Sequence, residues 1–187
     1  MSEPRIPLLL PEEAARAAKG AGIAEAIGQL SVFRVLLRHP ELAKRVNDLL
    51  MLLLLQGSLD ARLRELVIMR IGWSTRSVYE WTQHWRIALK LGVSERDLLA
   101  LRNWRSHDHW SPADRAVLAA TDETLDQGAI GPATWTECVA ELPTVEEQLE
   151  LVAAIGTWRL ISQILKSIEV PLEEGVAPWP PDGASPP

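Results

Sequence analysis

The chain has 187 residues, 47% of them hydrophobic, which is enough to build the core of one domain. Its formal net charge is −6 and its lysines and arginines are spread along the sequence, so nucleic acid is not an expected partner. Its single cysteine, Cys138, excludes an internal disulfide framework, a cysteine zinc cluster and a Cys-x-x-Cys redox pair.

Prolines are expected to hold residues 1–11 extended, as an arm on the body or on a neighbouring subunit. A short helix is predicted over residues 12–19, and two glycines then interrupt the chain before a second helix over residues 23–37. His39 precedes a proline at the end of that helix, and we expect it to be a capping or surface residue.

Pro40 opens a helix predicted to run to about Leu55, and its many leucines indicate burial on more than one side. Its most apolar stretch, residues 49–55, is far shorter than the roughly 20 residues that a membrane-spanning helix needs. The amino terminus also lacks a basic region followed by an apolar run. We therefore expect no membrane partner and a cytoplasmic location.

The central residues 62–91 are predicted to form two helices that break near 72–75, with Ser74 or Thr75 capping the second helix. A short helix ending at Leu101 follows.

Residues 102–110, rich in Trp and His, are predicted to form a loop. Capping patterns and prolines then predict three more helices, over residues 112–127, from 132 to near 143, and from 144 to about 168.

No segment makes a convincing strand, so the predicted class is all-α. The predicted organisation is a single helical domain over residues 12–170, followed by a Pro- and Gly-rich tail over residues 171–187 that adds nothing to the core.

Polar residues fall inside the apolar faces of the central hairpin. At about 100° per residue, Glu65 shares a face of the first helix with Ile68 and Met69. On the second helix Glu80 and His84 share a face with apolar neighbours. Buried ionisable groups need partners or a purpose, so we expect these side chains to meet in one partly dry pocket with Ser77.

The spacing of these residues carries a family resemblance. Glu65, eleven residues, Ser77, two residues, Glu80, three residues and His84 resemble the signature of the carboxymuconolactone decarboxylase and alkylhydroperoxidase-D-like (AhpD-like) superfamily, except at the two cysteine positions. The resemblance extends through most of the chain, including its last helix. It implies an AhpD-like all-helical bundle that assembles into trimers or hexamers, with Glu65 and His84 as proton-relay residues.

The departure from that signature decides which chemistry to expect. Peroxidase members carry a Cys-x-x-Cys where this chain has Ser77 and Glu80, so dithiol peroxide reduction is excluded. The Glu80-x-x-x-His84 spacing is similar to that of the true lactone decarboxylases. The resemblance therefore implies acid–base chemistry. Our hypothesis is that Glu80 and His84 together hold a proton near neutrality, that His84, held by Glu80, delivers it to carbon, and that Glu65 positions His84 or a water.

The expected protein is a cofactor-independent decarboxylase, isomerase or lactone hydrolase acting on a small conjugated or aromatic-derived acid or lactone. Two alternatives stay open: a binding or assembly protein on the same scaffold, and peroxide reduction that would have to use Cys138. Simpler interpretations of the motif also exist. Glu80 and His84 could be an ordinary helix-surface pair, and Glu65 could pair with Arg62 one turn earlier.

Aromatic residues near the motif suit a flat substrate. We expect Trp73, Tyr79 and Trp81, together with Ser77, to line the pocket.

His107 and His109 could cap the same pocket. Two loop histidines two positions apart are more often surface residues than metal ligands, so no metal is expected.

Overall fold

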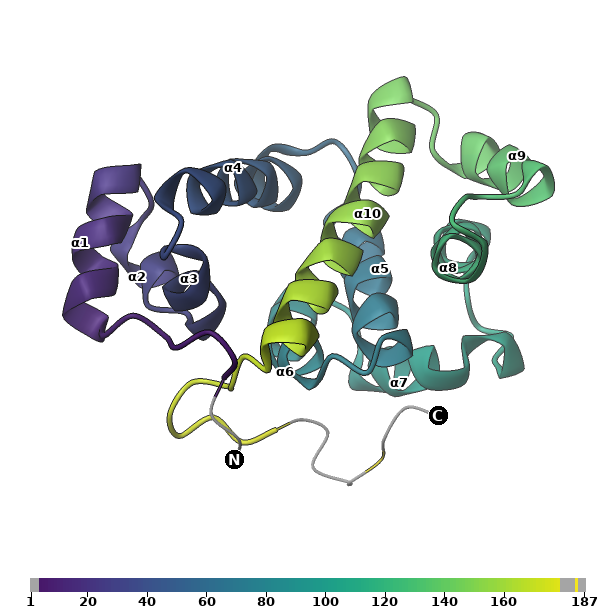
Figure 1. The fold of residues 1–187 in the computed structure, drawn as a ribbon. Coiled ribbons are helices and arrows are strands. Elements are labelled where there is room, and N and C mark those ends of the chain that lie inside the picture. The colour runs from purple at the N-terminus through teal and green to yellow at the C-terminus, as the bar shows by residue number, and fades with distance from the viewer. Residues whose placement is uncertain (1–3, 179–183, 185–187) are drawn as a thin grey trace. The chain divides into compact units, whose positions relative to one another are not determined.

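The computed structural model describes residues 4–178 and residue 184, and every regular element in that part of the chain is helical (Figure 1). The all-α class is therefore confirmed. In chain order the elements are α1 (Pro11–Ala21), α2 (Glu25–Gly28), α3 (Ser31–Leu36), α4 (Pro40–Met51), the π-helical turn η1 (Leu52–Gln56), α5 (Ala61–Ser74), α6 (Val78–Lys90), α7 (Glu95–Ala100), the 3₁₀ segment η2 (Leu101–Ser106), α8 (Pro112–Gln127), α9 (Pro132–Glu141) and α10 (Val145–Ile168).

The helices group into two compact units, each described here by itself. The amino-terminal unit takes in the chain up to Gln56 and Gln163–Ala177, and the central unit takes in Gly57–Ser162. The expectation of one domain over residues 12–170 stays a prediction.

The ends of the expected arm and tail fall outside the described part. Residues 1–3 of the arm, and 179–183 and 185–187 of the tail, lie outside the described residues.

The described part of the amino-terminal arm is bonded along its own unit. The backbone N–H of Arg5 donates to the carbonyl of Ile168 at 2.8 Å, and that of Leu9 donates to the carbonyl of Arg34 at 3.1 Å. Arg34 returns a bond from Nε to the carbonyl of Leu9 at 2.7 Å. Residues 4–10 thus form no helix and are fixed by backbone bonds, as the prolines indicate.

The single helix predicted over residues 23–37 is wrong. The chain forms α2 and α3 instead, with a break after Gly28. A Cβ added to Gly28 would lie 2.6 Å from the Cβ of Ala18 on α1, so this contact requires glycine. Glycine weakens a helix interior, and the helix ends where α1 approaches most closely.

The leucine-rich stretch also departs from expectation. Leu50 and Leu53 are buried, but Leu52 is 47% exposed and Leu55 76% exposed, so burial on more than one side is wrong. That expectation rested on the number of leucines. Burial depends instead on which side chains lie on the one face that α4 presents to its unit. At the start of α4, His39 accepts a bond from the backbone N–H of Leu42, which confirms its capping role.

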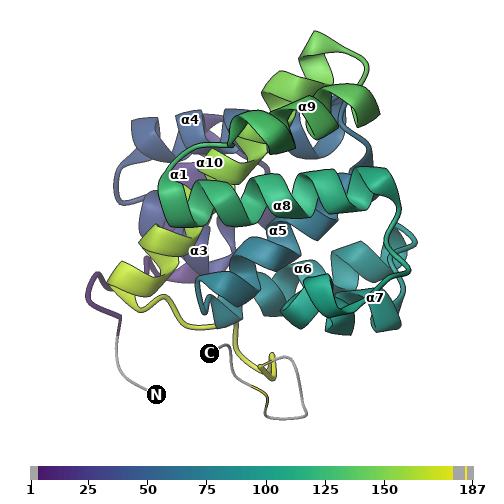
Figure 2. The same ribbon diagram turned by 90° about the vertical axis from the view of Figure 1, so that its right-hand side faces the viewer.

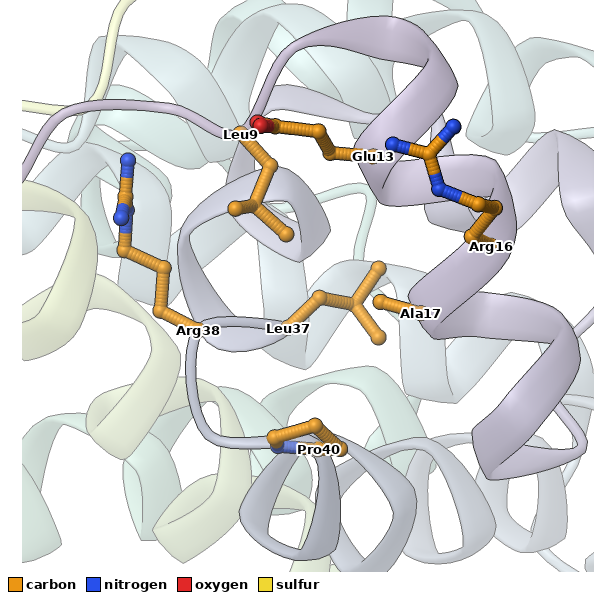
Figure 3. A pocket seen from close by; sticks show the side chains of 7 residues that line it. All are labelled: Leu9, Glu13, Arg16, Ala17, Leu37, Arg38 and Pro40. Carbon is orange, nitrogen blue, oxygen red and sulfur yellow. The ribbon is translucent and has the colours of Figure 1, made fainter.

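The amino-terminal unit contains a hollow of about 520 Å³, drawn in Figure 3. Its lining residues are Leu9, Glu13, Arg16, Ala17, Leu37, Arg38 and Pro40. The hollow holds none of the predicted site residues, all of which belong to the central unit.

In the central unit, α5 is the buried helix around which the others pack. α6 lies against it, and α8 crosses it in Figure 2. A Cβ added to Gly72 would lie 3.3 Å from the backbone nitrogen of Trp81 and 3.5 Å from the Cβ of Glu80. The missing side chain thus allows α5 and α6 to meet at the point where α6 presents Glu80.

The predicted cap of α6 is wrong. α5 continues through Ser74, and the hydroxyl of Thr75 donates back to the carbonyl of Ile71 at 2.8 Å, closing the end of α5. Arg76 turns the chain with a φ of 61°, and Ser77 occupies the position before the first residue of α6. The break therefore lies two residues later than the sequence indicates.

The later helices begin where the sequence predicts. Ser111 and Asp114 exchange the two bonds of a capping box at the start of α8. Thr144 and Glu147 do the same before α10, with N···O distances of 3.0 and 3.2 Å. The predicted loop over residues 102–110 is wrong in its first half, which is the 3₁₀ segment η2 that places Trp104 in the core.

By length and composition alone, α10 is long and apolar enough to cross a membrane. Buried core helices pass the same test, and Leu151, Ile155 and Trp158 of α10 are fully buried. The expectation of no membrane partner stays a prediction.

Candidate acid–base site

Glu65 of α5 and His84 of α6 form a buried pair. Glu65 is 0% exposed, and its Oε2 lies 2.9 Å from Nδ1 of His84. The guanidinium of Arg64 lies 3.6 Å from the other carboxylate oxygen. Arg62, the simpler partner considered for Glu65, pairs instead with Asp114 of α8. The structure thus brings together the two residues for which the resemblance implies a proton relay.

The other ring nitrogen of His84 is also bonded. Nε1 of Trp158, on α10, donates to Nε2 of His84 at 3.3 Å. The two rings meet edge to face, with centroids 5.9 Å apart and planes at 83°. His84 is therefore held from both sides, by a carboxylate on α5 and an indole on α10.

Glu80 sits one turn before His84 and is 2% exposed. The hydroxyl of Ser162, on α10, donates to its carboxylate, and the hydroxyl of Thr75 lies 3.0 Å from that of Ser162. Burial raises the pKa of Glu80 to about 7, against the opposing effects of the Ser162 bond, the His84 charge and the nearby hydroxyl of Ser77. A solvent-exposed pair of Glu80 and His84 is thereby excluded.

The predicted pocket-lining residues are buried around this region. Ser77, Tyr79, Trp73 and Trp81 are each less than 9% exposed. The rings of Trp73 and Trp81 lie 5.2 Å apart, and the guanidinium of Arg102 lies 4.8 Å from the ring of Trp73. A role for these side chains in substrate binding stays a prediction.

His107 and His109 form a cluster of their own. Nε2 of His109 lies 3.0 Å from Oδ1 of Asp97, and its ring stacks on Trp110 at 4.6 Å. The ring of His107 lies 5.6 Å from that of His109. Their bonds are thus made to α7 and the segment before α8, and their role in capping the pocket stays a prediction.

Within residues 4–178 and 184, no three His, Cys, Asp or Glu side chains gather as a metal site would require.

The region around this site matches the model of a known protein family. The model of the carboxymuconolactone decarboxylase family matches residues 40–123, which contain Glu65, Ser77, Glu80 and His84. This part of the chain is similar to the carboxymuconolactone decarboxylase family. No curated protein of known function matches the sequence.

Similar solved structures show the fold of the chain. An uncharacterised peroxidase-related protein from Ralstonia eutropha JMP134, described as an alkylhydroperoxidase AhpD core, is 16% identical. Its match covers 95% of this chain and 99% of its own, with a TM-score of 0.72. One from Silicibacter sp. TM1040 is 13% identical over 94% of this chain and 97% of its own, with a TM-score of 0.73.

The debrominase Bmp8, solved with 2,3,4-tribromopyrrole, is 16% identical over 87% of this chain and 85% of its own, with a TM-score of 0.69. At these identities the likeness shows the fold alone. The chain has the all-helical AhpD-like fold, and assembly into trimers or hexamers stays a prediction.

Two residues of the site were missed by sequence reasoning because they lie outside the family match. Trp158 and Ser162 are on α10, four positions apart and so on one face of that helix. One bonds to His84 and the other to Glu80. The available signal was a serine and an indole on the otherwise apolar face of the last helix.

The only thiol of the chain lies outside the α5–α6 hairpin. Cys138, its single cysteine, is buried on α9, and its thiol donates to the carbonyl of Ala116 at 3.6 Å. Burial, with the charges of Glu137 and Glu123, raises the pKa of this thiol to about 11. A thiol held in this way is a poor source of thiolate at neutral pH.

Proposed function

We propose that this protein is a cofactor-independent acid–base enzyme that decarboxylates, or shifts a proton within, a small conjugated or aromatic-derived acid or lactone. The observation that carries the proposal is a buried Glu80, with a pKa of about 7, one helical turn from the Glu65–His84 pair. A carboxyl that titrates near neutrality beside a held imidazole is suited to give and take protons at physiological pH.

The proton steps follow from the hydrogen bonds. In a decarboxylation the bond to the carboxylate breaks, CO₂ leaves, and the electron pair spreads into the unsaturated system of the substrate. His84 then delivers a proton to carbon, and Glu65 stabilises the imidazolium that exists before that delivery. Glu80, one helical turn away and with a pKa of about 7, is the proposed source of the replacement proton. An isomerase or a lactone hydrolase would use the same groups.

The thiol route is a weaker alternative. Peroxide reduction needs a thiolate, and Cys138 is buried with a pKa raised to about 11. Peroxidase activity in this chain would have to disappear in Cys138→Ser.

A binding protein is the second candidate, because the acid and base side chains are already bonded within the protein. Glu65 and Glu80 are almost fully buried, and both ring nitrogens of His84 already have partners. On this alternative, a ligand would bind equally well to Glu80→Gln and His84→Ala, and no product would form.

We propose further that the protein is a cytoplasmic homo-oligomer. α10 carries a stripe of exposed apolar side chains along one face: Val145, Leu149, Val152 and Leu160. Sedimentation velocity tests this proposal, and a monomer at micromolar concentration would contradict it. Glu in place of Leu149 should shift an oligomer toward monomer.

The deciding experiment is mass spectrometry of the protein incubated with a panel of conjugated acids and lactones. His84→Ala should lower turnover by roughly 10²–10⁴-fold without loss of fold, because the proton carrier is gone. The matched control is His39→Ala, which removes a histidine that caps α4 in the other unit. Turnover that survives in His84→Ala would overturn the proposal.

A further inference from the structure

We propose that Trp158 is a positioning residue that holds His84 in one neutral tautomer, protonated on Nδ1, with the Nε2 lone pair directed at the indole. The tautomer follows from the geometry alone, and its catalytic meaning rests on the proposed function. Trp158 lies on α10, is 1% exposed, and is outside the region that matches the family.

The assignment follows from what each group can donate. An indole N–H only donates, so the Nε2 atom that lies 3.3 Å from Trp158 Nε1 must carry a lone pair. Nδ1 of His84 lies 2.9 Å from Oε2 of Glu65, and a carboxylate only accepts, so Nδ1 must carry the hydrogen. Both bonds are satisfied by a single tautomer of His84, and neither survives in the other.

The surrounding charges favour the same arrangement. Arg64 lies 3.6 Å from the carboxylate oxygen of Glu65 that does not face His84, so a positive charge faces that oxygen. Glu80 precedes His84 by one turn, and its carboxyl is bonded to Ser162 on α10. On one face of α10, Trp158 thus donates its N–H to the base His84, and Ser162 donates its hydroxyl hydrogen to the acid Glu80.

A consequence concerns the substrate. The lone pair that would accept a proton is already bonded to the N–H of Trp158. A substrate must therefore replace both halves of that bond, with an acidic C–H for His84 and an oxygen acceptor for the indole. A carbonyl compound with an acidic C–H beside the carbonyl, or conjugated to it, offers both. The substrate class we infer is therefore a conjugated carbonyl compound, such as an unsaturated lactone, that ionises to an enolate.

The proton transfer is balanced without any further reagent. Nε2 of His84 takes H⁺ from the carbon, and the C–H electron pair moves onto the carbonyl oxygen to give an enolate. The N–H of Trp158 then donates to that oxygen, as a preorganised donor does in an oxyanion hole. Returning the proton to the same carbon, or to a conjugated one, completes exchange or isomerisation.

Nitrogen-15 NMR of the unliganded protein tests the tautomer directly. At a pH slightly above neutral we expect a protonated-type Nδ1 and an unprotonated-type Nε2 shift for His84. A scalar coupling across the hydrogen bond should link Trp158 Nε1 to His84 Nε2. A protonated-type Nε2 in the neutral ring would overturn the inference, and this measurement needs no variant.

Trp158→Phe keeps the aromatic body and removes the N–H donor. We expect the ring of His84 to become a mixture of tautomers in this variant, seen as intermediate shifts for both nitrogens. The matched control is Trp110→Phe, which loses a buried indole bond to the carbonyl of Trp104 at 3.0 Å. The control should leave the His84 shifts unchanged, whereas equal shifts in all three proteins would contradict a positioning role.

Exchange of C–H for deuterium in butenolide, followed by proton NMR in D₂O, separates this inference from the proposed function. We expect exchange with the wild type, none with His84→Ala, and a rate lower by about 10²-fold with Trp158→Phe. If NMR shows the expected tautomer but butenolide does not exchange, the acid–base function on lactones is contradicted, whereas the positioning role of Trp158 still holds. Exchange with an unchanged rate in Trp158→Phe would remove Trp158 from the reaction.

Discussion

The acids that pack on the two faces of α5 have different partners. On one face Arg62 and Arg70 pair with Asp114 and Asp122 of α8. On the other face, the carboxyl of Glu80 on α6 is surrounded by hydroxyls and an imidazole, with burial as the dominant influence. Both faces are buried, so burial alone does not distinguish structure from chemistry. What distinguishes them is whether a permanent positive charge neutralises the acid.

The pKa directions express this difference. Burial would raise the pKa of Asp122, but Arg70, Trp104 and Arg105 donate to it and hold that pKa below its ordinary value. Glu80 has no arginine partner among its pKa influences, and its pKa rises to about 7. An acid held ionised at all physiological pH values stabilises the fold, whereas one that titrates near pH 7 can move a proton.

The largest expected effect comes from breaking the structural face. Arg70→Leu leaves Asp122 buried without its main partner, so we expect the free energy of unfolding to fall by about 3–5 kcal/mol in urea denaturation. Arg105→Leu removes a second partner of the same carboxylate, but the Arg105 side chain is 57% exposed. That control should cost less than about 1 kcal/mol. Equal losses would show that burial of the cation does not matter here.

The pH dependence of stability should run in opposite directions on the two faces. The pKa of Asp122 is lowered on folding, so its contribution is present above the ordinary pKa of an Asp and is lost as pH falls. The pKa of Glu80 is raised from 4.5 to about 7, so its contribution is full below pH 4.5 and is lost as pH rises through about 7.

The rise in the pKa of Glu80 from 4.5 to about 7 corresponds to a change of about 3 kcal/mol in the free energy of unfolding between those two pH values. Glu80→Gln should remove this dependence, because an amide fills the same space without titrating. Urea denaturation of both proteins between about pH 5 and about pH 8 checks the prediction. A wild-type slope that persists in Glu80→Gln would assign the proton to another group.

The helices were predictable from the sequence wherever local chemistry sets them. Ser111 and Thr144 cap helices through side chains three residues away, and the hairpin faces that carry Glu65 and Glu80 follow from helical periodicity. The break after Gly28 was not predictable from local pattern, because a tertiary contact with Ala18 of α1, ten residues earlier, sets it.

The site was half predictable for the same reason. Glu65, Glu80 and His84 lie within one hairpin, so periodicity and spacing placed them together. Their partners Trp158 and Ser162 lie 74 and 82 positions further along the chain from His84 and Glu80. No local pattern reports which distant helix supplies a hydrogen bond, so only the three-dimensional structure could identify them.

The smallest expected effect tests the contact at Gly72, which sets the distance between α5 and α6. Gly72→Ala gains about 1 kcal/mol of helix propensity, but its Cβ would lie 3.3 Å from the backbone nitrogen of Trp81, which cannot swing away. We expect a net loss of roughly 1 kcal/mol in stability. Because α6 must shift, carrying Glu80 and His84 with it, activity should fall further than stability suggests.

Gly20→Ala is the matched control. Gly20 lies in α1, and a Cβ there would meet nothing within 4 Å, so this variant should gain about 1 kcal/mol from helix propensity alone. The difference between the two variants in urea denaturation therefore isolates the α5–α6 contact. If both glycine variants gained equally and turnover stayed constant, the close approach at Gly72 would have no part in positioning Glu80. A difference of about 2 kcal/mol with reduced turnover would tie the packing of α5 on α6 directly to the acid–base pair.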